Sequence, residues 1–393
     1  MRRIYLDYAA TTPTDKRVVD AMAPYYSEMF GNASSIHRYG REAKAALENS
    51  RAKLASLIGA RESEFFFVSG GTESDNSALF GIASKFSSSD KKNIVISSIE
   101  HHAVFHAADS LRNEGFDVRM LPVDSKGFVS PHELELAITE KTFLVSIIHV
   151  NNEIGTIQNL PELIKVSHNH GALFHTDAVQ SFCKTNFNVR ELDVDLASFT
   201  AHKIYGPKGI GALFIKRGID FEPMLHGGSQ ERNRRPGTES VPLAVGFAKA
   251  AELCAEEFDS ERSRLSNLNS VLKENISTGI PGVMFNSPEE NSVPNILSVS
   301  VDSCEVELDG EALLVNMDLE GVAVASGSAC SSGSLQPSHV IKALGRDDKT
   351  TMATVRFSLG RFTNEEEISI ATDVFARIVA RIGRRKRISS AVS

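Results

Sequence analysis

Runs of strand length, most of them apolar, alternate with helix-like stretches from residue 64 to residue 215. The runs cover residues 64–68, 93–97, 117–121, 142–149, 171–177, 195–199 and 210–215. Amphipathic or capped stretches predict helices at about 15–28, at about 39–58, and beginning near 102, 131 and 160. Strands that alternate with helices are typical of a mainly parallel sheet covered by helices on both faces, so we predict an α/β fold.

The chain of 393 residues is too long for one ordinary core, which suggests two domains. Its character changes after a helical stretch at about 240–272, where a Pro/Asn-rich loop begins. Short strand-like runs then follow at 296–301, 322–325 and 354–358. We predict a large domain over residues 14–258 and a smaller α+β domain made of residues 1–13 and 259–393.

Composition limits the class of protein. The hydrophobic content of 41% and charged content of 23% suit a soluble globular chain, and no apolar run is long enough to span a membrane. The net charge of −8 gives no reason to expect nucleic-acid binding. The four cysteines lack CxxC spacing and the N-terminus lacks a signal-peptide core, so we expect a reduced, cytoplasmic protein. The basic tail at 381–387 is interpreted as a solvated helix end, or alternatively as a docking site for an acidic partner.

One lysine lies between two of the apolar runs. Lys203 follows the run at 195–199 and precedes a Gly/Pro turn. A lone loop lysine is usually solvated. If it is buried, its pKa falls because the charged form loses hydration, and the neutral amine can form a Schiff base.

Asp177 ends the run at 171–177, upstream of Lys203. Ligands of open α/β sheets bind at the carboxyl ends of strands, where we expect both side chains to lie. Pyridoxal phosphate enzymes need this pair, since the lysine carries the cofactor and the carboxylate keeps the pyridine nitrogen protonated.

A glycine turn, Ser69-Gly-Gly-Thr72, follows the run at 64–68. Thr72 and Asp75 have the spacing of a helix N-terminus. A strand, a glycine turn and a helix start together form an anion site, because free N–H groups and the positive end of the helix dipole converge there. The turn is a candidate phosphate site.

Six sequence motifs, in order, are similar to those of the cysteine desulfurases, which are pyridoxal-dependent enzymes of the class V aminotransferase fold. They are Tyr8-Ala-Ala-Thr-Thr-Pro13, Ser69-Gly-Gly-Thr-Glu-Ser-Asp-Asn76, Glu100-His101, His149-Val-Asn-Asn-Glu-Ile-Gly155, Ala201-His-Lys203 and Ser326-Gly-Ser-Ala-Cys330. The resemblance extends from about residue 4 to about residue 375. It implies fold type I of the pyridoxal phosphate enzymes, with a seven-stranded, mainly parallel sheet and a smaller α+β domain.

The resemblance also implies a set of site residues. Contacts to pyridoxal 5′-phosphate are implied for Gly71, Thr72, Asn152, Asp177, Gln180, Thr200, His202, Lys203 and Thr238. Thr238 is expected to reach the cofactor of a partner subunit, which implies a homodimer. His101 would stack on the ring and exchange protons with substrate, as a flat group that titrates near neutrality can. Spacing alone does not distinguish Asn151 from Asn152.

Arg356 interrupts an apolar run, and its guanidinium suits either the α-carboxylate of an amino acid, together with Asn152, or a structural ion pair. Cys330 lies among glycines and serines, which predicts a mobile, exposed loop at about 326–335. No metal ligands are expected, Cys254 is expected in the core, and we assign no role to Cys183 or Cys304.

The resemblance implies conversion of L-cysteine to L-alanine, with the sulfur held on Cys330 as a persulfide. The family passes such sulfur to an acceptor protein, such as an iron–sulfur scaffold, or into tRNA thiolation. Selenocysteine lyase is the nearest alternative, and an aminotransferase would not need Cys330. A non-catalytic scaffold is a third possibility, although the joint presence of Lys203, Asp177, His101 and Cys330 argues against it.

Overall fold

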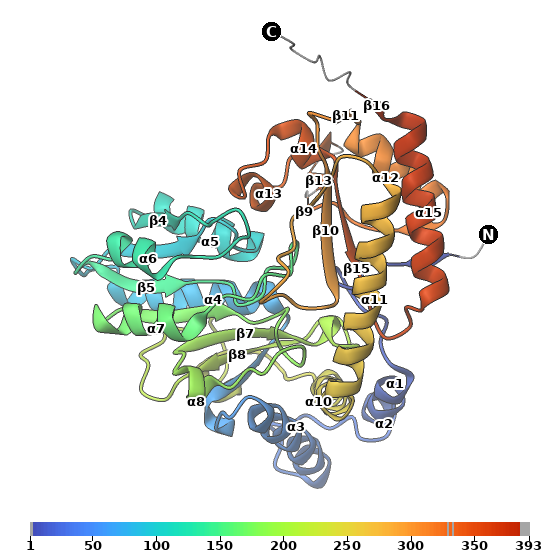
Figure 1. Cartoon of the computed structure of the whole chain (residues 1–393). Helices are drawn as coiled ribbons and strands as arrows, with labels where there is room; N and C mark the ends of the chain where they lie inside the picture. The colour runs from blue at the N-terminus through green and yellow to red at the C-terminus, as the bar shows by residue number, and fades with distance from the viewer. Residues whose placement is uncertain (1–2, 328–329, 332–333, 386–393) are drawn as a thin grey trace.

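The computed structural model describes residues 3–327, 330–331 and 334–385, and gives the backbone alone for Cys330, Ser331, Ser334, Leu335 and Arg385. Two lobes are visible in Figure 1, a larger one built on a wide sheet and a smaller one that carries the last helix. None of the helices in the described part of the chain is both long and apolar enough to cross a membrane.

Seven strands form the large sheet in the order β2-β8-β7-β6-β5-β3-β4. They are β2 (Phe65–Val68), β3 (Asn93–Ser97), β4 (Asp117–Leu121), β5 (Thr142–Ser146), β6 (Leu173–Asp177), β7 (Leu196–Thr200) and β8 (Gly211–Ile215). β8 pairs antiparallel with both of its neighbours, and the other pairs are parallel. The prediction of a mainly parallel, seven-stranded sheet is confirmed.

Alternate residues of most of these strands enter separate cores on the two faces of the sheet, whereas the edge strand β4 is largely exposed. Phe65 and Phe67 of β2 belong to one core, whereas Phe66 and Val68 belong to the other. Strands buried on both faces read as continuous apolar runs, which explains the sequence signal. The first core is covered mainly by α3 (Arg38–Leu57), α7 (Leu160–Asn169) and α10 (Val241–Glu256), and the second by α4 (Gly71–Ala83) and α5 (His102–Asn113).

The remaining helices of the large lobe are short. They are α1 (Lys16–Met22), α2 (Pro24–Ser27), α6 (Pro131–Ala137), α8 (Val189–Leu192) and α9 (Gln230–Asn233). The single helix predicted at about 15–28 is wrong, because the chain divides it at Ala23 before Pro24, whose ring cannot continue a helix without loss of a hydrogen bond.

The smaller lobe is built on three antiparallel strands in the order β15-β10-β9. These are β9 (Val283–Phe285), β10 (Ile296–Val301) and β15 (Thr354–Ser358), and they share an apolar core with α11 (Phe258–Gly279), α12 (Gly310–Leu319) and α15 (Glu365–Ile382). The short helices α13 (His339–Ala343) and α14 (Asp348–Met352) lie before β15. The exact domain boundaries at residues 13 and 258 stay predictions.

The N-terminal residues belong to the smaller lobe. β1 (Ile4–Tyr5) pairs parallel with β12 (Val322–Ala323), and Asp7 forms a further bridge with Ser358. Near the other end, Arg384–Arg385 form β16, which pairs with β11 (Val306–Glu307). The interpretation of the basic tail as a helix end therefore holds only to Ile382, and residues 386–393 lie outside the described residues.

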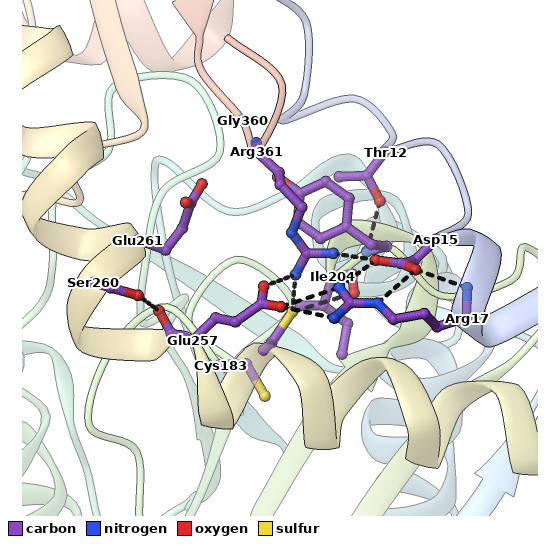
Figure 2. A network of polar contacts seen from close by, with 12 residues as sticks. Thr12, Asp15, Arg17, Cys183, Ile204, Glu257, Ser260, Glu261, Gly360 and Arg361 are labelled. Carbon is purple, nitrogen blue, oxygen red and sulfur yellow. Dashed lines mark hydrogen bonds and ion pairs between the residues drawn. The ribbon is translucent and has the colours of Figure 1, made fainter. Parts of the chain in front are cut away.

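Four alternating charges join the lobes (Figure 2). Asp15 and Arg17 lie at the start of α1, Glu257 lies between α10 and α11, and Arg361 follows β15. Arg17 contacts Asp15 at 2.8 Å and Glu257 at 3.0 Å, and Arg361 contacts Glu257 at 2.6 Å and also pairs with Asp15. The hydrogen bond from Arg17 lowers the pKa of the Asp15 carboxyl to about 2. Because the guanidinium of Arg361 also lies over the Tyr205 ring at 4.3 Å, the smaller lobe is held at several points.

Candidate active site

Nine of the predicted site residues line one cavity of about 250 Å³ at the carboxyl ends of the large-sheet strands. They are Gly71, Thr72, His101, Asn152, Asp177, Gln180, Thr200, His202 and Lys203. β6 ends at Asp177 and β7 at Thr200, while the glycine turn follows β2. The topology of the sheet brings these distant residues to one edge.

Lys203 ends a short 3-10 turn (Ala201–Lys203) directly after β7. Its Nζ donates hydrogen bonds to the carbonyl oxygens of Ala9 and Ala10, both at 2.6 Å. Burial, assisted by the charge of Arg356, lowers the pKa of Lys203 to about 8. The ammonium therefore gives up its proton more easily than an ordinary lysine, as a nucleophilic amine requires.

Two buried carboxyls face the cavity, and one of them was not predicted as a site residue. Asp177 accepts a hydrogen bond from the Val179 N–H at 2.8 Å, and burial raises its pKa to about 6. Asp75 is 1% exposed, and burial and the nearby Asp177 raise its pKa well above the usual range. Its Oδ1 is buried without a hydrogen-bond partner. The pair is poised to receive a cationic N–H group.

His101 lies at the N-cap of α5, within 4.8 Å of the ligand atoms of Asp75 and Asp177. Its Nδ1 accepts the Ala103 N–H at 3.1 Å, so in the neutral ring the proton is on Nε2. Burial and the charge of Lys203 lower the pKa of His101 to about 4. The imidazole is neutral at pH 7 and its Nε2–H is left for a ligand.

The glycine turn presents the N-terminus of α4, which has Gly70 as its N-cap. Glu73, not Asp75, completes the turn, since its Oε2 accepts the Ser69 N–H at 2.7 Å. The predicted cap role of Asp75 is wrong, because α4 already begins at Gly71 and Asp75 lies one turn into the helix, where its side chain is buried and lines the cavity. A second cavity of about 490 Å³ shares Gly71, Thr72, Thr200 and His202 with the first and continues to Lys208. An anion bound there would contact the backbone N–H groups of the helix start and also the Lys208 ammonium.

The structure separates the two asparagines. Asn151 is fully buried, donates to the Ile99 carbonyl at 2.8 Å and accepts from the N–H groups of Glu153 and Ile154. Asn152 lines the cavity. Asn151 therefore shapes the turn, and Asn152 is available to a ligand.

Gln180 is held by a second, half-buried lysine. Its Oε1 accepts from Lys184 Nζ at 2.7 Å, and its Nε2 donates to the Ala9 carbonyl at 2.8 Å. Burial lowers the pKa of Lys184 to about 7. These two contacts fix the orientation of the amide beside Lys203.

Two of the predicted residues, Arg356 and Thr238, do not line the 250 Å³ cavity. Arg356 is 6% exposed, donates to the Asn152 carbonyl at 2.8 Å and pairs with Asp7 at 2.7 Å. Thr238 is exposed and lines a separate cavity of about 200 Å³. The backbone of Cys330 forms β13 (Cys330–Ser331), which pairs with β14 (Ser334–Leu335), but its side chain and residues 328–329 and 332–333 lie outside what the structure describes.

Sequence reasoning missed Asp75, Val179 and Ile148, which also line the cavity. Val179 lies two residues after Asp177, so the strand end itself was a signal for it. A helical turn separates Asp75 from Thr72, and that spacing could have placed both on one face of α4. Nothing local distinguished Ile148 from a core residue.

A model of the aminotransferase class-V family matches residues 4–370. The cysteine desulfurase IscS of Dictyoglomus turgidum is 46% identical over 381 residues, covering 97% of this chain and 95% of that relative. The chain belongs to the cysteine desulfurase family. A solved structure described as a NifS-like protein has a TM-score of 0.90 at 37% identity, covering 97% of this chain and 100% of that one. A structure of SspA in complex with cysteine has a TM-score of 0.81 at 35% identity, covering 91% and 98%.

Cysteine desulfurases depend on pyridoxal 5′-phosphate, and the cavity fits that group in two respects. The buried carboxyls of Asp75 and Asp177 have raised pKa values, and Asp75 Oδ1 has no hydrogen-bond partner, so a protonated pyridine nitrogen would supply a cationic N–H group that this pair can accept. Gly71 packs so closely on Val179 that a Cβ atom would lie 2.9 Å from Val179 Cγ2, whereas above Gly70 the space is open for a phosphate. The predicted family and fold are confirmed, and the individual residue roles stay predictions.

Proposed function

We propose that this chain converts L-cysteine to L-alanine and takes the substrate sulfur on the thiol of Cys330. The observation that supports it best is the meeting of Lys203, Asp177 and His101 in one cavity with neighbouring backbone N–H groups. In the overall change the C–S bond of cysteine breaks and an S–S bond to Cys330 forms. The hydrogens of the two thiols end on the alanine methyl group and on the persulfide, so the reaction needs no external oxidant or reductant.

Within this proposal, Asp177 would pair with the pyridine nitrogen of pyridoxal phosphate, His101 would lie on its ring, and Gln180 would contact its phenolic oxygen. Its phosphate would meet Gly71, Thr72, Thr200 and His202, with Thr238 supplied by a partner subunit. When bound, the cofactor withdraws electrons from the substrate's α-carbon.

The chain's own groups move protons and hold the substrate. The Lys203 amine, with a pKa lowered to about 8, accepts the α-proton and returns a proton to the product. The Nε2–H of His101 donates to the substrate, because its Nδ1 is occupied by the Ala103 N–H. Arg356 and Asn152 hold the substrate carboxylate, and the pair with Asp7 fixes the guanidinium near Lys203 beforehand.

The test is to incubate the pyridoxal-loaded protein with L-cysteine and assay alanine and the mass of the Cys330 peptide. We expect one alanine per sulfur transferred and a Cys330 peptide heavier by one sulfur atom, which a reductant removes. Alanine formation without sulfur on Cys330 would refute the transfer step. Pyruvate or a keto acid in place of alanine would instead indicate an elimination or transamination activity.

Asp177→Asn is expected to retain the cofactor and to slow turnover by about two to three orders of magnitude. The amide keeps the shape of the side chain but removes the charge that stabilises a protonated ring nitrogen, and such electrostatic contributions are worth a few kcal/mol in the transition state. The measurement compares kcat with the bound-cofactor spectrum. Asp75→Asn is the matched control, because it changes the neighbouring carboxyl and leaves that of Asp177 in place. An equal loss of kcat in both variants would contradict the assignment of Asp177 as the partner of the ring nitrogen.

The protein is further proposed to act as a homodimer with shared sites. Exposed apolar side chains gather around the α2–α3 connection, namely Tyr26 (61% exposed), Phe30 (65%), Ile36 (91%) and Tyr39 (54%). The rings of Phe30 and Tyr39 stack at 5.6 Å, and a second copy would cover them. Thr238 lies outside the cavity of its own chain, as the sharing of sites requires.

Mixed dimers test this arrangement. A Lys203→Ala subunit and a Thr238→Ala subunit together form one intact site and one doubly damaged site, so mixing is expected to restore activity that neither homodimer has in full. The assay is L-cysteine turnover after subunit exchange, with sedimentation to verify dimers. A fully active monomer would rule out shared sites.

The sulfur on Cys330 would pass to an acceptor protein, such as an iron–sulfur scaffold, in the cytoplasm. The net charge of −8 supports a protein acceptor over direct binding to nucleic acid. The acceptor is expected to collect sulfur by thiol attack on the persulfide.

A further inference from the structure

The two ends of the segment that carries Cys330 meet at one buried carboxyl group. Ser338, the N-cap of α13, donates from Oγ to Glu153 Oε2 at 2.5 Å. On the other side of Cys330, the backbone of Gly327 packs against the same oxygen, because a Cβ atom placed there would lie 1.7 Å from Glu153 Oε2. Glu153 itself is 5% exposed. Its carboxyl therefore contacts the chain both before and after the cysteine.

The turn that carries Glu153 is tied by side-chain hydrogen bonds and adjoins the cavity. The Glu153 N–H donates to Asn151 Oδ1 at 2.9 Å, and the Asn151 side chain is itself bonded to the Ile99 carbonyl. Asn152, the preceding residue, lines the cavity, and its carbonyl accepts from Arg356. Glu153 thus connects the cavity wall to both ends of the 327–338 segment.

We propose that Glu153 is a positioning residue that fixes both ends of the 327–338 segment and thereby holds Cys330 within reach of the cavity. This inference rests on the proposed function, in which Cys330 receives the sulfur. Between the two fixed ends, β13 and β14 pair Cys330 with Leu335, so displacement of either end would move the cysteine backbone as well.

The position of Glu153 also makes the contact sensitive to pH. Burial raises the pKa of Glu153 to about 7, although the hydrogen bond from Ser338 and the charge of Arg356 both act to lower it. Arg356 itself forms its ion pair with Asp7 and not with Glu153. If the segment moves away and water reaches Glu153, its pKa returns toward about 4.3. The protonated carboxyl therefore favours the held state, and the contact weakens as the pH rises from about 4.3 through 7.

Two substitutions at Glu153 separate contact from charge. Glu153→Ala removes the contact, and we expect faster hydrogen exchange in peptides spanning 326–338, an about tenfold lower kcat and a KM for L-cysteine within about twofold. Glu153→Gln resembles the protonated acid, so it should keep the segment held and abolish the change in exchange between pH 6 and pH 8, after correction for intrinsic exchange. Unchanged exchange in Glu153→Ala would overturn the proposal, as would a wild-type pH response in Glu153→Gln.

A double-mutant cycle with Gly327→Ala tests the steric contact directly. In the wild-type background the added methyl group meets Glu153 Oε2, and we expect an about tenfold loss of kcat with faster exchange. In the Glu153→Ala background the nearest remaining atom is Ser338 Oγ at 3.1 Å, which has lost its carboxylate partner and can rotate away, so the further loss should be less than about twofold. Equal losses in both backgrounds would show that the two residues are not coupled.

Glu64→Ala is the matched control, because Glu64 is a buried carboxyl that accepts the N–H groups of Arg61 and Arg217 at the opposite end of β2. It should leave exchange at 326–338 unchanged. If Glu153→Ala does not fold, Ser338→Ala removes the same hydrogen bond from the other side. Failure of the proposed function can be distinguished from failure of this inference. If only the proposed function is wrong, Glu153→Ala would still speed hydrogen exchange at 326–338, but it would not change kcat.

Discussion

Lys203→Ala is expected to abolish turnover of L-cysteine and the visible absorption of the pyridoxal-loaded resting protein. Lys203 Nζ lies against the Ala9 and Ala10 carbonyls beside Asp177, and its pKa is lowered to about 8 by burial. Under the proposed function, loss of the amine removes both the attachment point of the cofactor and the base that accepts the α-proton. We expect a fall in kcat of at least about four orders of magnitude, as removal of a nucleophile and a general base together implies.

Lys208→Ala is the matched control for this variant. Lys208 is exposed and lines the neighbouring anion cavity, so its loss should weaken cofactor binding without abolishing turnover. Borohydride reduction of the loaded wild-type protein, followed by peptide mapping, should recover the cofactor on Lys203. Recovery on Lys208 would overturn the assignment.

Cys330→Ser is expected to retain cofactor and L-cysteine binding and to lose sulfur transfer. The thiol must ionise to attack the substrate sulfur, and a serine hydroxyl is a far weaker nucleophile toward sulfur. Alanine formation should fall by at least about two orders of magnitude, because the C–S bond then has no acceptor, and the peptide that contains residue 330 should carry no added sulfur. Cys304→Ser, at an exposed cysteine to which no role is assigned, should leave both readouts unchanged.

The same variant distinguishes the alternatives. A selenocysteine lyase would keep part of its activity on selenocysteine without the thiol, since selenium leaves more readily than sulfur. A transaminase would be indifferent to the substitution, and a scaffold would make no alanine even with Cys330 intact. Undiminished alanine production by Cys330→Ser would contradict the transfer mechanism.

Much of the large sheet could be predicted because most of its strands are buried on both faces. Apolar runs marked β3 to the residue, and β6 and β7 to within about two residues. The edge strand β4 carries Asp117 and Arg119 and is largely exposed, so it was predictable only from the alternation of strands with helices. β5 ends at Ser146, three residues before the predicted end at His149, because residues 147–149 stay buried after the chain leaves the ladder. Apolar sequence reports burial, and only a paired neighbour defines where a strand stops.

The site residues likewise fall into those that the sequence could predict and those that needed the structure. Motifs placed next to strand ends, such as Asp177 and Lys203, were predictable because topology brings strand ends together. Only the structure could distinguish Asn151 from Asn152, because it shows that the side-chain amide of Asn151 is occupied by hydrogen bonds to the backbone. Asp75 escaped notice because a buried carboxyl and a helix cap look alike in sequence. The ion-pair partner of Arg356 is Asp7, and the sequence could not indicate this pair because the two residues lie at opposite ends of the chain.

The pairing of the first strand with a late one has a consequence for biosynthesis. β1 can find its neighbour only after Val322 and Ala323 have left the ribosome, and Asp7 can meet Arg356 only after β15 has followed. The large sheet contains no residue beyond Ile215, so it can form while the rest of the chain is still being made. The wall that would hold the substrate carboxylate is therefore completed last, and a nascent chain could bind its cofactor before it is able to consume cysteine.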